Sequence, residues 1–375
     1  MKAQQMSLFK DGWQSVLSTI GIDPNILLLF VSPSFEGKKK VVDFLQIKYP
    51  KATIIGCSTA GEISDITVKD DTISLTAIQL EKTTFKKVTC KVKDMLYSEE
   101  AGIELAEQLY TDTLKHVLIF SDGLNVNGAD LVSGLKSKLP NVSITGGLAG
   151  DGSDFEKTFV INGNIIEDKT IVALGLYGDN LKVGYSSKGG WDSFGIERLV
   201  TKSNKNVLYE LDGESALKIY KSFLGEQAKN LPSSGLLFPL SMRDKGNAAP
   251  VVRTILAIDE EDQSLTFAGN IPQDSYVRLM KANIDRIIDG AEDSAKSANK
   301  LMKNGSQVAI LISCVGRRLV LKQMVEEEIE AVRGVLGDQP CITGFYSYGE
   351  IAPFGQFSPC ELHNQTMTIT TLTEC

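Results

Sequence analysis

The sequence predicts an α/β (α+β) protein with two related domains built from repeated β-α-β-β units, whose mixed β-sheets are covered by helices. Apolar segments of strand length alternate with amphipathic segments of helix length, which is typical of parallel strands joined by helices. Hairpin signals such as Asn162-Gly163 add antiparallel pairs, so the sheets are expected to be mixed. Glycine turns follow several of the apolar strands, and such strand ends are common ligand sites in α/β proteins.

The first half of the chain contains two of these units, and each has a helix between two apolar strands. The expected elements are a strand at residues 25–32, a helix at 36–49, strands at 51–62, 71–80 and 83–92, a helix at 99–112, a strand at 115–123, a helix at 127–139, a strand at 141–154 and a hairpin at 158–166.

The second half repeats the pattern and gives two further units. The expected elements are a strand at residues 205–211, a helix at 213–225, strands at 235–241, 250–259 and 263–271, a long helical stretch from about 276 to 303, a strand at 306–316, a helix at 321–336 and strands at 339–350 and 361–372. The halves are expected to meet near residue 190, in the glycine-rich stretch "SSKGGWDSFG", which gives modules of residues 1–190 and 191–375.

Composition and charge exclude several classes of protein. The 375 residues are 42% apolar and 23% charged, with a net charge of −8, so a nucleic-acid partner is not expected. The apolar runs are far shorter than a membrane span, and the N-terminus has no secretory signal, so a cytoplasmic location without membrane association is expected. The six cysteines form no CxxC pair, and the chain has only two histidines, so a multi-histidine metal site is not expected.

Two glycine turns share the same spacing. "GCSTAGE" runs from Gly56 to Glu62, and "GFYSYGE" runs from Gly344 through Gly349 to Glu350; an isoleucine follows each. A third turn, "GGLAGDG", places Asp151 after its glycines. Two explanations stay open: the glycines supply backbone conformations that other residues resist, or the acids of the turns border a shared binding site.

Further side chains near strand ends are candidates for binding or catalysis. Arg317, which follows the strand at 306–316, is expected to take an anionic group. Arg318 is expected to form a surface ion pair with Glu326 or another acid on a nearby helix. "GCSTA" loosely matches a nucleophile elbow around Ser58, but no helix is expected after it. Cys57 stays open as a thiol nucleophile, with Glu62 or Glu350 for acid/base work.

The order of these motifs resembles the FIST family over nearly the whole chain. "GCSTAGEI" and "GGLAGDG" resemble its N-terminal module. Seven further blocks resemble the C-terminal module of the family: "PLSM", "VVRTI", "LTFAGNIP", "VRLM", "ILISCVGRR", "GFYSYGEIAP" and "LHNQT".

The resemblance implies a sensory module that binds a small ligand, with amino acids as proposed ligands. The family that the chain resembles also includes a subset of stand-alone bacterial haem proteins, which sense nitric oxide and act on histidine kinases or cyclic-di-GMP enzymes. No output segment accompanies the modules in this sequence, so the resemblance implies a separate signalling partner. If haem is the cofactor, His363 in "LHNQT" is the better candidate for the axial ligand, because His116 opens an apolar strand.

We therefore expect a non-catalytic, ligand-binding sensor, and the alternatives are a haem-based nitric-oxide sensor, a Cys/Ser-dependent enzyme and an interaction scaffold without ligand. The candidate ligand-binding residues are Gly56, Cys57, Ser58, Thr59, Glu62, Arg317, Gly349 and Glu350, with His363 as a metal ligand only if haem binds.

Overall fold

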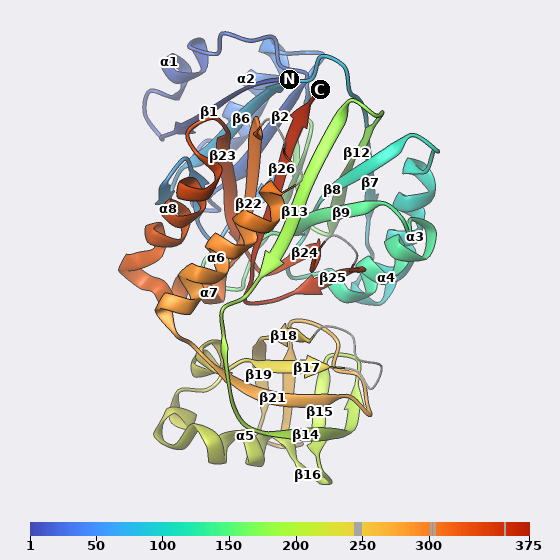
Figure 1. The fold of residues 1–375 in the computed structure, drawn as a ribbon, viewed down its shortest axis with the longest axis vertical. Coiled ribbons are helices and arrows are strands. Elements are labelled where there is room, and N and C mark those ends of the chain that lie inside the picture. Colours follow the sequence, from blue (N-terminus) through green and yellow to red (C-terminus); the bar gives the residue numbers. More distant parts are fainter. Residues whose placement is uncertain (244–249, 301, 303–304, 356–357) are drawn as a thin grey trace.

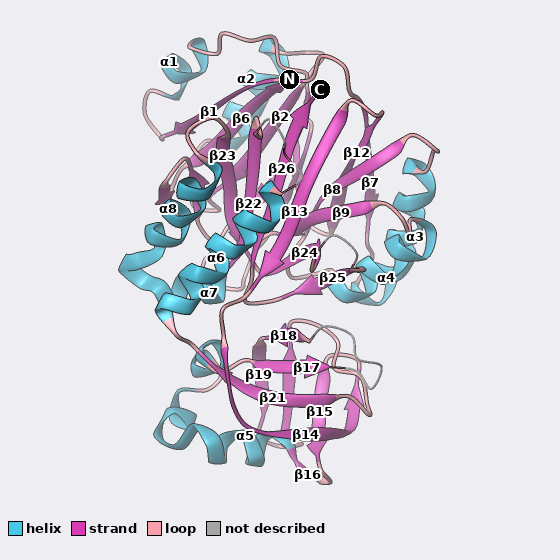
Figure 2. Ribbon diagram, in the orientation of Figure 1, coloured by secondary structure: helices cyan, strands magenta, loops and turns pink. Residues whose placement is uncertain are grey.

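The computed structural model shows a chain of two unequal lobes, a large body of β-sheets and helices and a smaller β domain (Figure 1). The structure describes residues 1–243, 250–300, 302, 305–355 and 358–375. Both chain ends lie at the end of the body that is remote from the β domain (Figure 1). Helices cover the outer faces of the body's sheets (Figure 2). Within the described residues, none of the helices is both long and apolar enough to cross a membrane.

The body contains three repeats, and the first begins at the N-terminus. Its elements are β1 (Lys2–Leu8), α1 (Trp13–Ser18), β2 (Ile26–Val31), α2 (Lys38–Lys48), β3 (Thr53–Ser58), β4 (Glu62–Ser64), β5 (Thr67–Lys69) and β6 (Ile73–Gln79). Every residue of β2, "ILLLFV", is buried, which suits a strand covered on both faces. In α2, Val41, Val42 and Leu45 form the buried face, so the helix packs against the sheet through this side.

The second repeat has the same order of elements. They are β7 (Thr84–Lys91), the 3-10 turn η1 (Met95–Tyr97), α3 (Ser98–Leu109), β8 (Leu114–Ser121), α4 (Gly128–Lys138), β9 (Ser143–Leu148), β10 (Val160–Asn162), β11 (Ile165–Glu167) and β12 (Thr170–Tyr177). Asn127 caps α4, because its side-chain oxygen accepts hydrogen bonds from the backbone N–H groups of Ala129 and Asp130. This cap starts the helix directly after the loop that follows β8.

The third repeat is interrupted after its first strand. Its elements are β13 (Leu181–Lys188), α6 (Ile284–Asn299), β22 (Val308–Cys314), α7 (Val315–Leu321), the 3-10 turn η4 (Lys322–Met324), α8 (Val325–Leu336), β23 (Cys341–Ser347), β24 (Gly349–Pro353), β25 (Cys360–His363) and β26 (Met367–Glu374). The chain leaves the body after β13 and returns at α6, and the residues between these two elements form the β domain (Figure 1).

The β domain pairs its strands only in the antiparallel sense within the described residues. Its elements are β14 (Asp192–Asn204), β15 (Val207–Leu211), β16 (Glu214–Ser215), α5 (Ala216–Leu224), η2 (Gly225–Asn230), η3 (Ser233–Leu237), β17 (Leu240–Arg243), β18 (Val251–Arg253), β19 (Ile255–Asp259), β20 (Ser264–Phe267) and β21 (Tyr276–Lys281). The strand order is β18-β17-β21-β14-β15-β20-β19, with β16 beside β15. This domain has its own apolar core, in which α5 packs against the sheet.

The repeats complete one another's sheets by exchanging hairpins. Within the described residues the body has three six-stranded sheets, β1-β6-β2-β3-β10-β11, β7-β12-β8-β9-β24-β25 and β13-β26-β22-β23-β4-β5. Each sheet has one parallel pair at its centre and ends in a hairpin that belongs to another repeat. The first repeat gives β4-β5 to the third, the second gives β10-β11 to the first, and the third gives β24-β25 to the second.

Three aromatic rings, one from each sheet, meet at the centre of the body. The ring of Phe30 stacks on Phe345 with centroids 4.8 Å apart, and Phe120 lies edge-on to both at 5.4 and 6.0 Å. All three side chains are fully buried. Gly147 leaves room for this cluster, because a Cβ atom there would lie 3.3 Å from the Phe345 ring. The shared aromatic core therefore stabilises all three repeats together.

The first glycine of each turn has a packing role. Gly56, Gly146 and Gly344 occupy equivalent positions in the second strand of each parallel pair. At each of them a Cβ atom would overlap a backbone carbonyl oxygen of the neighbouring parallel strand, at Leu29, Ile119 and Leu311 respectively. Close approach of two backbones therefore explains why glycine recurs at these positions.

The expected class of mixed α/β sheets covered by helices is confirmed, and so is the hairpin at Asn162-Gly163. The expected count of four β-α-β units is wrong, because the strands between residues 192 and 281 form an antiparallel domain inserted into a third repeat. The long helix expected from residue 276 begins only at Ile284, since residues 276–281 form β21; its expected end near 303 lies outside the described residues. The expected module boundary near 190 coincides with the end of β13, and the division into modules 1–190 and 191–375 stays a prediction.

We expect Gly344→Ala to destabilise the fold by about 3 kcal/mol or more, because the added methyl group forces two strands of the central pair apart. Gly334→Ala is the matched control: this exposed glycine lies within α8 with open space around it, so alanine should stabilise the helix by about 0.5–1 kcal/mol. Urea unfolding of the purified variants measures both changes. Equal stability of the Gly344→Ala variant and the parent chain would show that the strands can separate at little cost.

Candidate functional site

The three glycine turns meet in a ring of backbone hydrogen bonds. The N–H of Ala60 donates to the carbonyl of Tyr346 at 2.8 Å, the N–H of Gly150 to Ser58 at 3.0 Å, and the N–H of Tyr348 to Leu148 at 3.2 Å. The first and third turns share a second bond, from the N–H of Tyr346 to the carbonyl of Gly61 at 2.9 Å, so each turn is bonded to both of the others. The sequence motifs that looked like separate turns form one junction between the three repeats.

Glu62 of the first turn is a buried carboxylate held by hydroxyl groups. One oxygen accepts a short hydrogen bond from the Thr59 hydroxyl, and the other accepts from the N–H and hydroxyl of Thr72 at 3.1 and 2.8 Å. Burial raises the pKa of Glu62 to about 7, and these hydrogen bonds oppose the rise. All its partners in the described residues are internal, so the carboxylate ties the turn to the start of β6.

Glu350 repeats this arrangement in the third turn. Its oxygens accept from the Ser347 hydroxyl at 2.6 Å and from the hydroxyl and N–H of Thr366 at 2.9 and 3.2 Å. The side chain is fully buried, and burial raises the pKa of Glu350 to about 8 against the effect of these hydrogen bonds. The recurrence of the acid after the last glycine therefore has a structural reason in both repeats.

Asp151, the acid of the second turn, has a different structural role. The Asp151 carboxylate accepts from the backbone N–H groups of Phe155, Glu156 and Lys157 at 3.0, 2.8 and 2.6 Å, and from the hydroxyl of Tyr348 in a short hydrogen bond. It folds the loop after β9 back onto the third turn. The ring of Phe155 consequently stacks on Tyr348, with centroids 4.4 Å apart and planes 12° from parallel.

Arg317 is fully buried, and its guanidinium group is occupied by internal partners. It binds the Glu328 carboxylate, with Nη2 at 2.6 Å and Nε at 3.1 Å, and donates to the carbonyls of Gly189 and Ile287. These bonds connect α7 to α8, to α6 and to the end of β13. Arg318 lies nearer the surface and forms an ion pair, as expected, but its partner is Asp70 between β5 and β6 rather than an acid on a helix. The anion-binding role of Arg317 stays a prediction without a contact that supports it.

The candidate nucleophiles lie inside the body. Cys57 is fully buried in the core, and burial raises the pKa of its thiol well above the usual range. The hydroxyl of Ser58 is buried and accepts a hydrogen bond from the N–H of Phe159 at 3.0 Å. A buried thiol with a raised pKa is a poor nucleophile, so the geometry does not favour the enzyme hypothesis.

Haem does not fit beside His363 in this structure. The ring is 1% exposed, and its Nε2–H donates to the carbonyl of Ala352 at 2.9 Å, which leaves Nδ1 as the lone-pair nitrogen. Burial lowers the pKa of His363 to about 4, and Phe354 packs against the ring at 5.5 Å. No group of three or more His, Cys, Asp or Glu in the described part of the chain could hold a metal ion.

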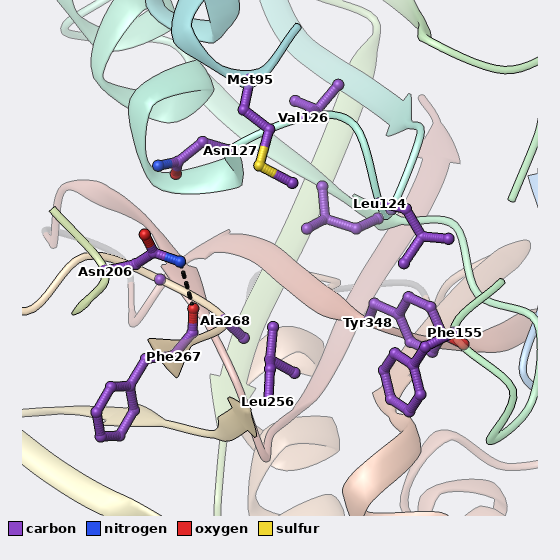
Figure 3. A pocket seen from close by; sticks show the side chains of 13 residues that line it. Met95, Leu124, Val126, Asn127, Phe155, Asn206, Leu256, Phe267, Ala268 and Tyr348 are labelled. Atoms are coloured by element: carbon purple, nitrogen blue, oxygen red, sulfur yellow. Dashed lines mark hydrogen bonds between the residues drawn. The ribbon is translucent and has the colours of Figure 1, made fainter. Parts of the chain in front are cut away.

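A cleft lies between the body and the β domain, beside the junction of the turns. It comprises a cavity of about 620 Å³ and an adjoining one of about 70 Å³, and Phe155 and Leu256 border both. Figure 3 shows the smaller cavity, with Leu124, Phe155 and Tyr348 of the body facing Leu256 of the β domain, while the ring of Phe267 points away into the core of that domain. The larger cavity is lined by Ser153, Phe155, Pro232, Leu236, Leu237, Ile255, Leu256, Leu319, Val320 and Lys322.

Hydrogen bonds join the two lobes beside this cleft. Arg253 of β18 donates to the carbonyl of Leu362 at 2.8 Å, and Trp191 donates from its indole nitrogen to the carbonyl of Gln365 at 2.9 Å. The side-chain amide of Gln365 in turn donates to the carbonyl of Leu236 at 3.2 Å. The turn between β25 and β26, part of the "LHNQT" motif, therefore connects the body to the β domain.

The candidate residues from sequence and the lining of the cleft do not overlap. The predicted set forms the turns and the core behind the cleft, and neither cavity is lined by any of its members. Sequence reasoning missed the lining residues, which come from the loop after β9, from η3, from β19 and from α7. The available signal was an apolar Phe155 among the polar residues "GDGSDFEK", since one aromatic residue in a polar loop often contacts something else.

The fold and the cleft define a two-lobed α/β protein with an inter-lobe space of the size that small ligands occupy. The chain belongs to the FIST family: residues 25–214 match the FIST N domain, and residues 216–353 match the FIST C domain. Membership supports a sensory role in signal transduction.

Individual relatives add little about function. The chain is 26% identical to an uncharacterized protein of Methanocaldococcus jannaschii, in an alignment that covers 86% of this chain and 69% of that one. Among solved structures it is similar to a cyanuric acid hydrolase from A. caulinodans, with a TM-score of 0.42, 7% identity and coverage of 100% and 99%. A second cyanuric acid hydrolase structure gives a TM-score of 0.31 and 9% identity over the same shares of the chains. These similarities are too weak to support a functional argument.

We expect Arg317→Met to lower the free energy of unfolding by about 3–5 kcal/mol, because it leaves the Glu328 carboxylate buried without its charged partner. Arg318→Met, which removes the more exposed pair with Asp70, should cost about 1 kcal/mol or less. Denaturant unfolding of both variants measures the difference. A ligand-binding role alone would instead leave the stability of the Arg317→Met variant unchanged.

Glu350→Gln should reduce the dependence of stability on pH. Because the folded pKa of about 8 exceeds the ordinary value of 4.5, the folded chain holds a proton that the unfolded chain releases between these values. The stabilisation from this proton is complete below the unfolded pKa and is lost as the pH rises through about 8. Between about pH 5 and about pH 9, the melting temperature of the parent chain should therefore fall further than that of the variant.

Glu330→Gln is the control for this measurement, because Glu330 lies exposed on α8. It should follow the parent chain at every pH. If the Glu350→Gln variant also followed the parent, the Glu350 carboxyl would have the same pKa in the folded and unfolded chains.

Proposed function

We propose that this protein is a small-ligand sensor whose ligand occupies the cleft between the body and the β domain. The observation that carries the proposal is the composition of the cleft walls. Ser153, Leu319 and Lys322 come from the body, and Leu236 and Leu256 come from the β domain. A bound molecule would contact both lobes at once, so its binding energy would depend on how the lobes are placed.

The position of the cleft supports the same function. It lies beside the carboxyl ends of the parallel strands β8, β9, β22 and β23, where α/β proteins commonly bind ligands. The buried state of Cys57 and Ser58 favours binding without chemistry. An apolar space of this size at a domain interface is typical of ligand sites.

Two chain segments connect the lobes and could transmit occupancy. Residues 189–191 lead from β13 to β14, and residues 282–283 lead from β21 to α6. Gly190 has φ +103°, and a Cβ atom there would overlap the carbonyl of Arg286, so the first connection passes tightly against α6. Trp191, 8% exposed, lies in the same connection and is bonded to the body. A ligand that favours one placement of the lobes would change the surroundings of Trp191 in this connection.

The signalling partner expected from the resemblance is a histidine kinase or a cyclic-di-GMP enzyme in the cytoplasm, and we retain this as a proposal. Amino acids are ligands to test first, for the same reason. Haem with His363 as axial ligand is not part of the proposal, because the buried ring lines neither cavity.

Trp191 provides a direct test in a Trp13→Phe background, since the chain has only two tryptophans. A ligand of the cleft should raise the melting temperature, because it binds the folded state, and should also change the Trp191 fluorescence. At about 100 times its dissociation constant, a ligand stabilises the fold by about 2.7 kcal/mol. Amino acids and small organic acids form the first screen, read by both signals.

The matched controls are Leu256→Glu, which places a charge in the cleft, and Ile196→Glu, at an exposed site of the same domain outside the cleft. Leu256→Glu should weaken binding, and Ile196→Glu should not. Binding that survives Leu256→Glu unchanged would place the site elsewhere. A screen without any stabilising molecule would favour the scaffold hypothesis.

A further inference from the structure

The lining of the larger cavity restricts the chemistry of its occupant. Eight of the ten lining residues are apolar, and the remaining two are Ser153 and Lys322. No Asp or Glu is among the described residues that line either cavity. A molecule with many polar groups would lose hydrogen bonds to water there without replacing them. A cation would meet the charge of Lys322 and find no carboxylate in the lining.

Lys322 has an unusual backbone conformation for a lysine. It ends α7 with φ 53° and ψ −114°, a region that strongly favours glycine. The end of α5 has nearly the same geometry, with φ 55° and ψ −124°, and there the residue is Gly225. Strained residues of this kind occur often at functional sites, because the side chain is kept despite its conformational cost.

The ammonium group of Lys322 is available to a ligand. The residue is exposed, and its side chain forms no ion pair or hydrogen bond with any other residue that the structure describes. The hydroxyl of Ser153, on the loop after β9, is also exposed and lines the same cavity. The two polar groups of the lining are therefore both able to donate hydrogen bonds, and one of them carries a positive charge.

We propose that the ligand of the cleft is a small amphipathic carboxylate, with its apolar body between the lobes and its anionic group at Lys322. The inference rests on the proposed function and specifies its ligand class. Leu236 and Leu237 of η3 face Leu319 and Val320 of α7 as the apolar walls, and Phe155 adds an aromatic ring. The carboxylate accepts hydrogen bonds from the Lys322 ammonium and the Ser153 hydroxyl at the polar part of the lining.

A matched pair of probes tests the charge: decanoate and its neutral analogue decanamide, titrated against the full chain by calorimetry at low salt. 2-Naphthoate and 2-naphthamide repeat the comparison with an aromatic body. We expect each carboxylate to bind about threefold to fivefold more tightly than its amide, the range for an exposed ion pair, and the difference to shrink as salt is added.

Three variants complete the test. Lys322→Gln should remove the preference for the carboxylate, whereas Lys51→Gln, an exposed lysine remote from the cleft, should keep it. Lys322→Gly should lose the preference and yet raise the melting temperature, because glycine adopts this backbone conformation without strain. A purely structural lysine would give the gain in stability without any change in binding.

The outcomes separate this proposal from the function on which it rests. If carboxylates and amides bind equally and both are weakened by Leu256→Glu, the cleft is a ligand site but the anionic class is wrong. If binding is insensitive to Leu256→Glu, the cleft itself is not the site and both proposals fail. If none of the four probes binds at millimolar concentration, the amphipathic class is overturned, while the screen with Trp191 still decides whether the cleft binds another ligand.

Discussion

The cyclic exchange of hairpins is the constraint on which the rest of the body depends. Strands such as β4 and β5 have three residues each, too short to be stable alone, and they become part of a six-stranded sheet only on another repeat. Each repeat therefore needs the other two. The exchange also brings the turns after β3, β9 and β23 into one ring of hydrogen bonds. Leu148 and Tyr348 of this ring line the smaller cavity together with Leu256 of the β domain.

Buried polar groups link the elements around the junction of the three repeats. Glu62 and Glu350 join their turns to the following strands through hydroxyl groups, and Arg317 with Glu328 joins helices that surround the third sheet. Such groups are costly to bury unless every hydrogen bond is made, so they fix one arrangement of the repeats. The side chains that looked most functional in the sequence thus hold the body together, and the cleft that we propose as the ligand site is lined mainly by apolar residues beside them.

The inserted β domain supplies one wall of the cleft. The cleft exists only because the third repeat is interrupted between β13 and α6, which places η3 and β19 opposite α7 and the loop after β9. Polar contacts through Arg253, Trp191 and Gln365 hold one side of the lobe interface, and the other side stays open and apolar. A ligand that fills the open side would compete with no internal hydrogen bond for its position.

Much of this protein was determined by the sequence alone. Buried runs such as "ILLLFV" and the Asn162-Gly163 hairpin are local signals, so strands, turns and the mixed α/β class follow from them. The block order likewise indicates the FIST family. Only the tertiary structure decided that there are three repeats rather than four, that Gly56 faces a neighbouring carbonyl, and that Phe155 and Lys322 border one cleft. These facts depend on contacts between segments far apart in the chain. The local periodicity of apolar residues does not indicate which repeat a hairpin will join.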